Sequence, residues 1–274
     1  MKRNSRQTSK ATASNHSRGA HGTKLPHLAA DSGSIEVRRE GGCVVARLTR
    51  IAARNRVSAR MAIALMELAE AVEDEDAVRA LAITGAGNSF STGFDPDVDS
   101  RVVEALNAVS KPTIAILNGD AFDEGLELAL ALDLRLTLSG ARFALTQLQR
   151  GVLPQYGGTQ RLPRLIGAAR SLKMMLTSEV IDGDEALRLG LVTYLAADRK
   201  KLERVTRDLF ATIESRGPVG VRLVKEAVRK GFDMTLEQGI RLEEDLYALL
   251  QTTADRAEGV RAFLEKRKPI FKGA

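Results

Sequence analysis

The chain has 274 residues, of which 44% are hydrophobic and 28% are charged, so it can bury a sizeable core in one main domain with an appendage. Its single cysteine, Cys43, excludes an intramolecular disulfide and a cysteine-built metal site. No apolar run approaches the roughly 18 residues of a membrane span, and nothing resembles a secretory signal. We therefore expect a protein of the cytoplasm, with no membrane partner.

The net charge of +6 arises in the N-terminal segment, because residues 1–30 contain no acid and the remaining chain is neutral overall. This composition predicts a disordered basic tail over residues 1–33. The tail is either passive or a transit segment, which would place the protein in an organelle matrix. It could bind nucleic acid weakly through phosphates, but no specific nucleic-acid recognition is expected. All three histidines lie in the tail, so acid–base chemistry in the folded body must use carboxylates, lysine or tyrosine.

Alternating strands and helices begin near Ser34. Ile35–Arg39 and Cys43–Leu48 are predicted to form a hairpin about Glu40-Gly41-Gly42. Apolar residues at helical spacing predict a helix that starts at Ser58, its N-cap, and ends near Glu73. Further strands are expected at 78–84, 112–117 and 134–139, and further helices at 100–110 and 124–132. This order of elements indicates an α/β core over residues 34–200.

The chain is predicted to be almost wholly helical from about Arg170 onward. We interpret residues 201–274 as a helical region appended to the α/β core. The expected helices are 170–178, 184–189, 200–215, 218–230, 235–253 and 255–265.

Two apolar runs end in glycine-bearing turns, at Gly85–Asp95 and within Lys111–Asp133. A strand that leads into a turn of free backbone N–H groups makes a site for a developing negative charge. Two such turns from separate parts of the chain can meet around one oxygen atom. The pattern predicts oxyanion chemistry.

Acidic residues lie around the start of the helix expected at 124–132. Glu127 lies in a stretch that is apolar nearly all round, so we expect it to be buried and either functional or a partner of the helix dipole. Asp120, Asp123 and Glu124 are interpreted as N-cap or dipole partners, with metal binding as an alternative. The glycine pair at 157–158 could bind phosphate, although it lacks the lysine of a P-loop.

Taken together, these segments resemble the enoyl-CoA hydratase/isomerase (crotonase) family over about residues 35–272. The resemblance rests on many short motifs that occur in the family's order. They are Phe90–Asp95, Lys111-Pro112, Asn118-Gly119, Glu127–Ala129, Asp133–Arg135, Ala141–Phe143, Gly157–Leu162, Glu185–Val192 and Phe263–Pro269.

The resemblance implies a crotonase-like spiral of β-β-α units, with C-terminal helices that assemble homotrimers or dimers of trimers. It implies an acyl-CoA thioester as ligand, with coenzyme A entering as part of the substrate and no separate cofactor or metal. The thioester oxygen would lie between the backbone N–H groups of Phe94 and Glu124, which form the oxyanion hole. Residues that would contact CoA are Arg54, Arg56, Val57, Phe263 and Lys266, the last two often in a neighbouring subunit.

Four positions depart from the family's pattern. The first catalytic glutamate of the family's hydratases falls on Glu127, but the second falls on Gln147, whose amide can orient water and cannot supply a proton. Asp123-Glu124 replaces small residues, and Phe94 replaces the usual alanine. Two hypotheses remain. The first is an acyl-CoA enzyme with one-base chemistry through Glu127, with Gln147 beside it, which could isomerise a double bond, hydrate slowly, decarboxylate or cleave a thioester. The second is a non-catalytic acyl-CoA-binding or structural subunit.

Overall fold

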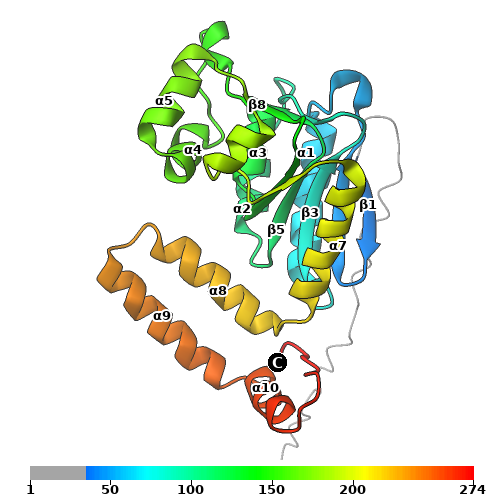
Figure 1. The fold of residues 1–274 in the computed structure, drawn as a ribbon, viewed down its shortest axis with the longest axis vertical. Coiled ribbons are helices and arrows are strands. Elements are labelled where there is room, and N and C mark those ends of the chain that lie inside the picture. The colour runs from blue at the N-terminus through cyan, green and yellow to red at the C-terminus, as the bar shows by residue number, and fades with distance from the viewer. Residues whose placement is uncertain (1–34) are drawn as a thin grey trace, which may run out of the picture.

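The computed structural model describes residues 35–274 (Figure 1), and the predicted tail at 1–33 lies outside this range. A six-stranded sheet forms the centre, in the order β1-β2-β3-β5-β7-β10, and a four-stranded sheet has the order β4-β6-β8-β9. The pairs β1–β2 and β8–β9 are antiparallel, and the others are parallel. The strands are β1 Ile35–Glu40, β2 Cys43–Leu48, β3 Ala80–Gly85, β4 Ser89–Ser91, β5 Thr113–Leu117, β6 Asp120–Phe122, β7 Leu134–Leu138, β8 Arg142–Ala144, β9 Ile181–Asp182 and β10 Tyr194–Ala196.

Successive units of the chain place one strand in each sheet and then continue into a helix. β3 and β4 lead to α2 (Arg101–Ala108), β5 and β6 lead to α3 (Glu124–Leu130), and β7 and β8 lead to the 3₁₀ turn η2 (Gln147–Arg150) and α4 (Gly158–Ile166). Because β3, β5 and β7 are parallel neighbours, the turns that follow them meet at one edge of the sheet. The predicted spiral of β-β-α units is confirmed.

The first hairpin and first long helix form as expected. Gly41 has φ +61°, a left-handed conformation that glycine adopts without strain, and Glu40 pairs with Cys43 across the turn. The Ser58 Oγ accepts a hydrogen bond from the Met61 N–H at 3.3 Å and caps α1 (Ala59–Asp74), which follows the 3₁₀ turn η1 (Ile51–Ala53).

The prediction of an almost wholly helical chain after Arg170 is wrong at β9 and β10. Both strands are shorter than four residues, which is too short for an alternating hydrophobic pattern. Their pairing with β8 and β7 decides their conformation. Helix α7 (Arg199–Glu214) buries Leu202 and Phe210 in the apolar cluster on one face of the large sheet. The other helices of this region are α5 Ala168–Thr177, α6 Gly183–Arg188, α8 Pro218–Gly231, α9 Leu236–Gln251 and α10 Ala254–Leu264.

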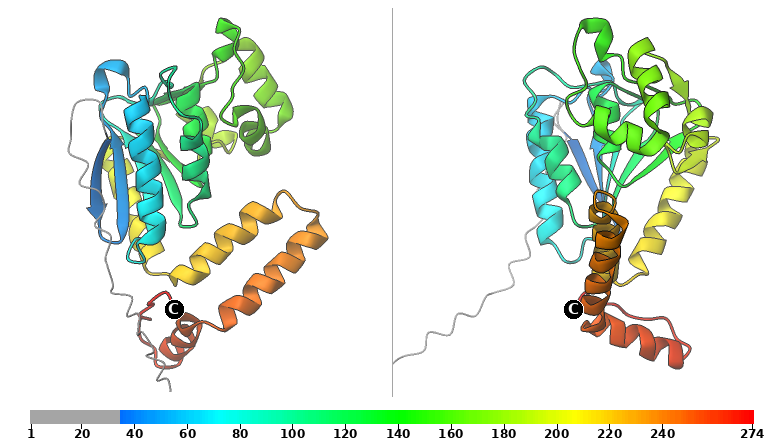
Figure 2. Two further views of the ribbon diagram at one scale, coloured as in Figure 1. Left: turned by 180° about the vertical axis from the view of Figure 1, so that it is seen from behind. Right: turned by 90° about the vertical axis from the view of Figure 1, so that its left-hand side faces the viewer.

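Helices α8, α9 and α10 extend away from the two sheets (Figures 1 and 2). Lys225 and Arg229 of α8 join this extension to the core through ion pairs with Asp133, at 2.7 and 2.8 Å. Large apolar side chains on these helices are exposed, among them Val228 and Phe263. No helix within residues 35–274 is long and apolar enough to cross a membrane.

Candidate active site

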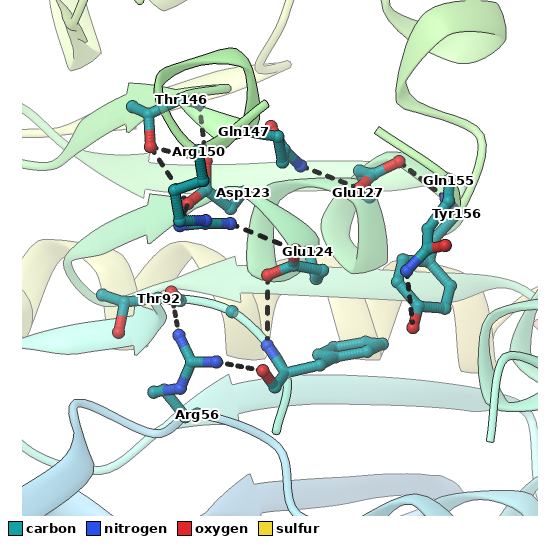
Figure 3. A network of polar contacts seen from close by, with 12 residues as sticks. Arg56, Thr92, Asp123, Glu124, Glu127, Thr146, Gln147, Arg150, Gln155 and Tyr156 are labelled. Carbon is teal, nitrogen blue, oxygen red and sulfur yellow. Dashed lines mark hydrogen bonds and ion pairs between the residues drawn. The ribbon is translucent and has the colours of Figure 1, made fainter. Parts of the chain in front are cut away.

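The two predicted glycine turns lie against each other at the start of α3 (Figure 3). A methyl group added to Gly125 would lie 2.2 Å from the Ser91 carbonyl oxygen, so only a glycine lets α3 approach the first turn this closely. Gly93 has φ +133°, a conformation that L side chains rarely adopt, and it turns the chain into Phe94. The close contact places the start of α3 against the turn that carries Phe94.

Arg56 and Val57 hold the turn that carries the Phe94 N–H. Arg56 donates hydrogen bonds to the carbonyl oxygens of Phe94 and Thr92, the second at 3.4 Å. The backbone of Val57 brackets the same turn, because its N–H donates to Gly93 and its carbonyl accepts from the Asp95 N–H, at 2.9 and 2.8 Å. These contacts hold the Phe94 N–H in one direction.

The Phe94 N–H points at the side chain of Glu124. It donates to Glu124 Oε2 at 3.2 Å, and the other oxygen of this carboxylate lies 3.6 Å from Arg150 Nη2. Glu124 is also the first residue of α3, so its own N–H has no acceptor within the helix. A carboxylate of the same chain therefore lies on one of the two donors that the sequence predicts for an oxyanion hole.

Asp123 does not cap α3 with its side chain, and its interpretation as a partner of the helix dipole stays a prediction. Asp123 occupies the N-cap position with φ +50° and makes no side-chain cap. Its carboxylate instead accepts from the Thr146 N–H at 2.5 Å and from Arg150 Nη1 at 3.0 Å. Asp120 likewise pairs with Arg142 at 2.7 Å. Within residues 35–274 no group of three or more His, Cys, Asp or Glu side chains is placed to hold a metal ion.

Glu127 is fully buried and makes three hydrogen bonds. Its Oε1 accepts from the backbone N–H groups of Tyr156 and Gly158, both at 2.8 Å, and its Oε2 accepts from Gln147 Nε2 at 3.0 Å. A methyl group on Gly158 would lie 2.9 Å from Glu127 Oε1. The glycine turn thus holds the catalytic candidate, and the hypothesis that its N–H groups bind phosphate is wrong.

The environment of Glu127 raises its pKa from 4.5 to about 7. Burial away from water is the largest cause, and the negative charges of Glu124 and Asp123 add to it. The hydrogen bonds from Gly158 and Tyr156 act in the opposite direction but do not cancel the effect. A carboxyl group with a pKa near 7 can both accept and release a proton at neutral pH.

The raised pKa predicts a pH-dependent contribution of Glu127 to stability. A carboxyl with a higher pKa in the folded than in the unfolded chain stabilises the fold fully below pH 4.5, and this contribution is lost as the pH rises through about 7. The difference corresponds to about 3 kcal/mol. We expect the free energy of unfolding of the parent to fall by this amount relative to Glu127→Gln between pH 4.5 and about 8. Denaturant titrations across this range check it, and parallel curves for the two proteins would contradict it.

Gln147 lies beside Glu127 and donates to it through Nε2. Its side chain is 1% exposed, and its Oε1 has no hydrogen-bond partner among the described residues. A buried acceptor without a donor is costly, and a ligand or water O–H at this point would satisfy it. The amide oxygen therefore marks a place for a proton donor next to the Glu127 carboxylate.

The residues predicted to contact CoA divide into two groups. Arg54 pairs with Asp120 at 2.9 Å, Arg56 holds the Phe94 turn, and Val57 is fully buried, so these three lie beside the site. Phe263 is 82% exposed at the end of α10, and Lys266 follows it. These two are not brought to the site within one chain, because α10 lies away from α3 in every view (Figures 1 and 2).

Sequence reasoning missed Tyr156 and Arg150. The Tyr156 N–H holds Glu127, and its ring packs on Phe94 with 5.0 Å between ring centroids. Arg150 joins the carboxylates of Asp123 and Glu124. A tyrosine next to a glycine pair and an arginine before a glycine are common in loops, so no local signal distinguished them.

Comparison with known proteins assigns the family. The family model described as enoyl-CoA hydratase/isomerase matches residues 38–274. The chain is 34% identical to a crotonyl-CoA hydratase of Syntrophomonas wolfei, over 87% of this chain and 97% of that protein. It is 38% identical to an (E)-benzylidenesuccinyl-CoA hydratase of Thauera aromatica, over 83% and 94%. The crystal structure of an enoyl-CoA hydratase from Bacillus anthracis has a TM-score of 0.84 and 33% identity and covers 88% of this chain and 99% of that one. The chain belongs to the enoyl-CoA hydratase/isomerase family.

Proposed function

We propose that the protein is an acyl-CoA enzyme that hydrates or isomerises an enoyl-CoA thioester through its enolate, with Glu127 as the acid–base residue. One observation carries the proposal: a fully buried carboxylate with a pKa of about 7, that of Glu127, lies on the helix that begins at Glu124. The hydratases among its relatives support a CoA thioester as substrate. The proposed chemistry uses coenzyme A as part of the substrate and no other cofactor.

The thioester carbonyl oxygen would accept hydrogen bonds from the N–H groups of Phe94 and Glu124. Negative charge moves onto this oxygen when water adds to the β-carbon, or when a proton leaves the carbon skeleton, to give an enolate. Fixed donors stabilise that charge without having to reorganise, and each is worth about 3 kcal/mol of the barrier. The oxyanion hole therefore favours the enolate over the ground-state thioester.

Glu127 would carry the proton on Oε2, because Oε1 already accepts from two backbone N–H groups. In hydration, ionised Glu127 takes one proton from water while the hydroxyl adds to the β-carbon. The same proton, or one exchanged with solvent, then goes to the α-carbon of the enolate. Gln147 would accept a hydrogen bond from the attacking water through its unsatisfied Oε1. A single carboxyl group thus serves as base and then as acid.

Gln147→Glu is expected to raise the hydration rate and to change its pH dependence. The new carboxyl would face Glu127 at the 3.0 Å separation that the amide now has, and two carboxylates this close share one proton. One group would then hold the water while the other supplies the proton. Initial rates with a short trans-2-enoyl-CoA across the pH range check this prediction. A rate no higher than that of the parent at every pH would contradict it.

A non-catalytic acyl-CoA-binding subunit is the second candidate. The carboxylate of Glu124 on the Phe94 N–H favours it, because a permanently occupied donor cannot stabilise an enolate. Turnover decides between the two candidates. A CoA thioester that binds without hydration, isomerisation or solvent exchange would establish the binding protein and end the enzyme proposal.

We also propose that α8–α10 assemble the chain into homotrimers or dimers of trimers. Their exposed apolar side chains, such as Val228 and Phe263, would be buried between chains. A neighbouring chain's Phe263 and Lys266 would then reach the CoA of this site. Sedimentation equilibrium of the full chain tests this assembly, and a monomer at micromolar concentration would exclude it.

A further inference from the structure

One donor of the candidate oxyanion hole already has an acceptor from its own chain. Glu124 Oε2 lies 3.2 Å from the Phe94 nitrogen, and the Glu124 side chain is 13% exposed. The same oxygen would lie 2.6 Å from a methyl group on Gly93, so the carboxylate sits directly over the turn (Figure 3). A thioester oxygen cannot use the Phe94 N–H while this carboxylate is there.

The two acceptors that compete for the Phe94 N–H differ in strength. A carboxylate makes a charge-assisted hydrogen bond, which is about twice as strong as that of a neutral carbonyl. The neutral oxygen of a saturated thioester is therefore the weaker competitor. Conjugation with a carbon–carbon double bond moves electron density onto the carbonyl oxygen, so an enoyl thioester competes better.

Arg150 offers a second position for the Glu124 carboxylate. Its Nη1 is bound to Asp123 at 3.0 Å, whereas its Nη2 is 3.6 Å from Glu124 Oε1. The Arg150 side chain is 51% exposed and can follow a small movement of Glu124. A rotation of the glutamate toward the guanidinium would shorten this ion pair and release the Phe94 N–H. It would also keep a neutralising charge beside the displaced carboxylate while the enolate forms.

We propose that Glu124 and Arg150 form a gate on the oxyanion hole that selects conjugated over saturated CoA thioesters. In the ligand-free protein the carboxylate closes the hole, and in the acyl-CoA complex it is held by Arg150. This inference rests on the proposed function, because it assumes that a thioester oxygen enters the hole. A ligand without a thioester carbonyl, such as free CoA, does not need the gate to open.

Calorimetric titration of the full chain with butyryl-CoA and with free CoA tests the gate. Glu124→Ala is expected to bind butyryl-CoA at least tenfold more tightly than the parent and to bind free CoA with unchanged affinity. Glu124→Gln keeps the volume of the side chain and loses its charge. It should bind butyryl-CoA with an affinity between those of the parent and Glu124→Ala. Arg150→Gln should weaken butyryl-CoA binding about tenfold, and this loss should vanish in the double variant with Glu124→Ala. Glu67→Ala, an exposed residue on α1, is the matched control.

Selectivity is measured in the Glu127→Gln background, which does not turn the ligand over. There the preference for crotonyl-CoA over butyryl-CoA should shrink several-fold when Glu124→Ala is added. Equal butyryl-CoA affinities for the parent and Glu124→Ala would overturn the gate and leave the proposed function intact. If butyryl-CoA binds to neither protein and crotonyl-CoA does not bind in the Glu127→Gln background, the proposed function itself fails, and the gate fails with it.

Discussion

Glu127→Gln is expected to lower kcat for enoyl-CoA hydration by a factor of about 10² to 10⁴, the usual contribution of a positioned acid–base group. The amide oxygen of the variant can still accept from the Tyr156 and Gly158 N–H groups, so the turn stays in place. Its NH₂ group would face Gln147, whose amide can turn its unsatisfied Oε1 toward it. The variant therefore removes the proton carrier and leaves the packing almost unchanged. Loss of the enoyl thioester's ultraviolet absorbance gives the rate.

The matched control for this substitution is Glu67→Gln, on the exposed face of α1. It makes the same chemical change away from the site, so its kcat should equal that of the parent. The parent's kcat/KM for hydration should rise with pH through about 7, since ionised Glu127 acts as the base. A Glu127→Gln variant that retains more than half of the parent's rate would remove Glu127 from the mechanism.

Gly125→Ala is expected to destabilise the fold by about 3 kcal/mol, at the upper end of the usual range for overpacking. Alanine is the better helix former, by up to about 1 kcal/mol. The added methyl group would lie 2.2 Å from the Ser91 carbonyl oxygen and 2.6 Å from its carbon, so the steric term wins. Relief of the clash must separate α3 from the first turn. Hydration activity should therefore fall at temperatures where the variant is still folded.

Gly140→Ala is the control for the glycine prediction. No atom lies within 4 Å of a methyl group at Gly140, which is exposed. Its free energy of unfolding should stay within about 0.5 kcal/mol of the parent's. Denaturant titration and hydration assays on both variants give the comparison. Equal stability and activity for Gly125→Ala and Gly140→Ala would show that the close contact at Ser91 does not position the site.

The sequence predicts the parts of this protein whose structure is decided locally. The β1–β2 hairpin, the capped helix α1 and the buried position of Glu127 follow from turn residues, helical spacing and an apolar surround. The strands β4, β6, β8, β9 and β10 have only two or three residues each, and their pairing partners are distant in the chain. Pairing within the sheet sets their conformation, so the local sequence has no hydrophobic periodicity that predicts them.

The contacts of the site were harder to predict than its members. Asp123 has the sequence features of a helix cap, but its φ of +50° turns its carboxylate toward Thr146 and Arg150. The Gly158 turn reads as an anion-binding loop, and it does bind an anion, the carboxylate of Glu127. Both outcomes depend on which segments the fold brings together. The sequence indicated which residues belong to the site, but only the structure shows which residues they contact.

Incubation of the parent protein with a short trans-2-enoyl-CoA in deuterated water tests the central claim most directly. If Phe94 and Glu124 stabilise an enolate that Glu127 protonates, mass spectrometry will show a 3-hydroxyacyl-CoA with deuterium on the α-carbon. Glu127→Gln should form almost none of this labelled product over the same time. Recovery of unlabelled, unhydrated thioester from the parent would contradict the account and leave a protein that binds CoA thioesters without transforming them.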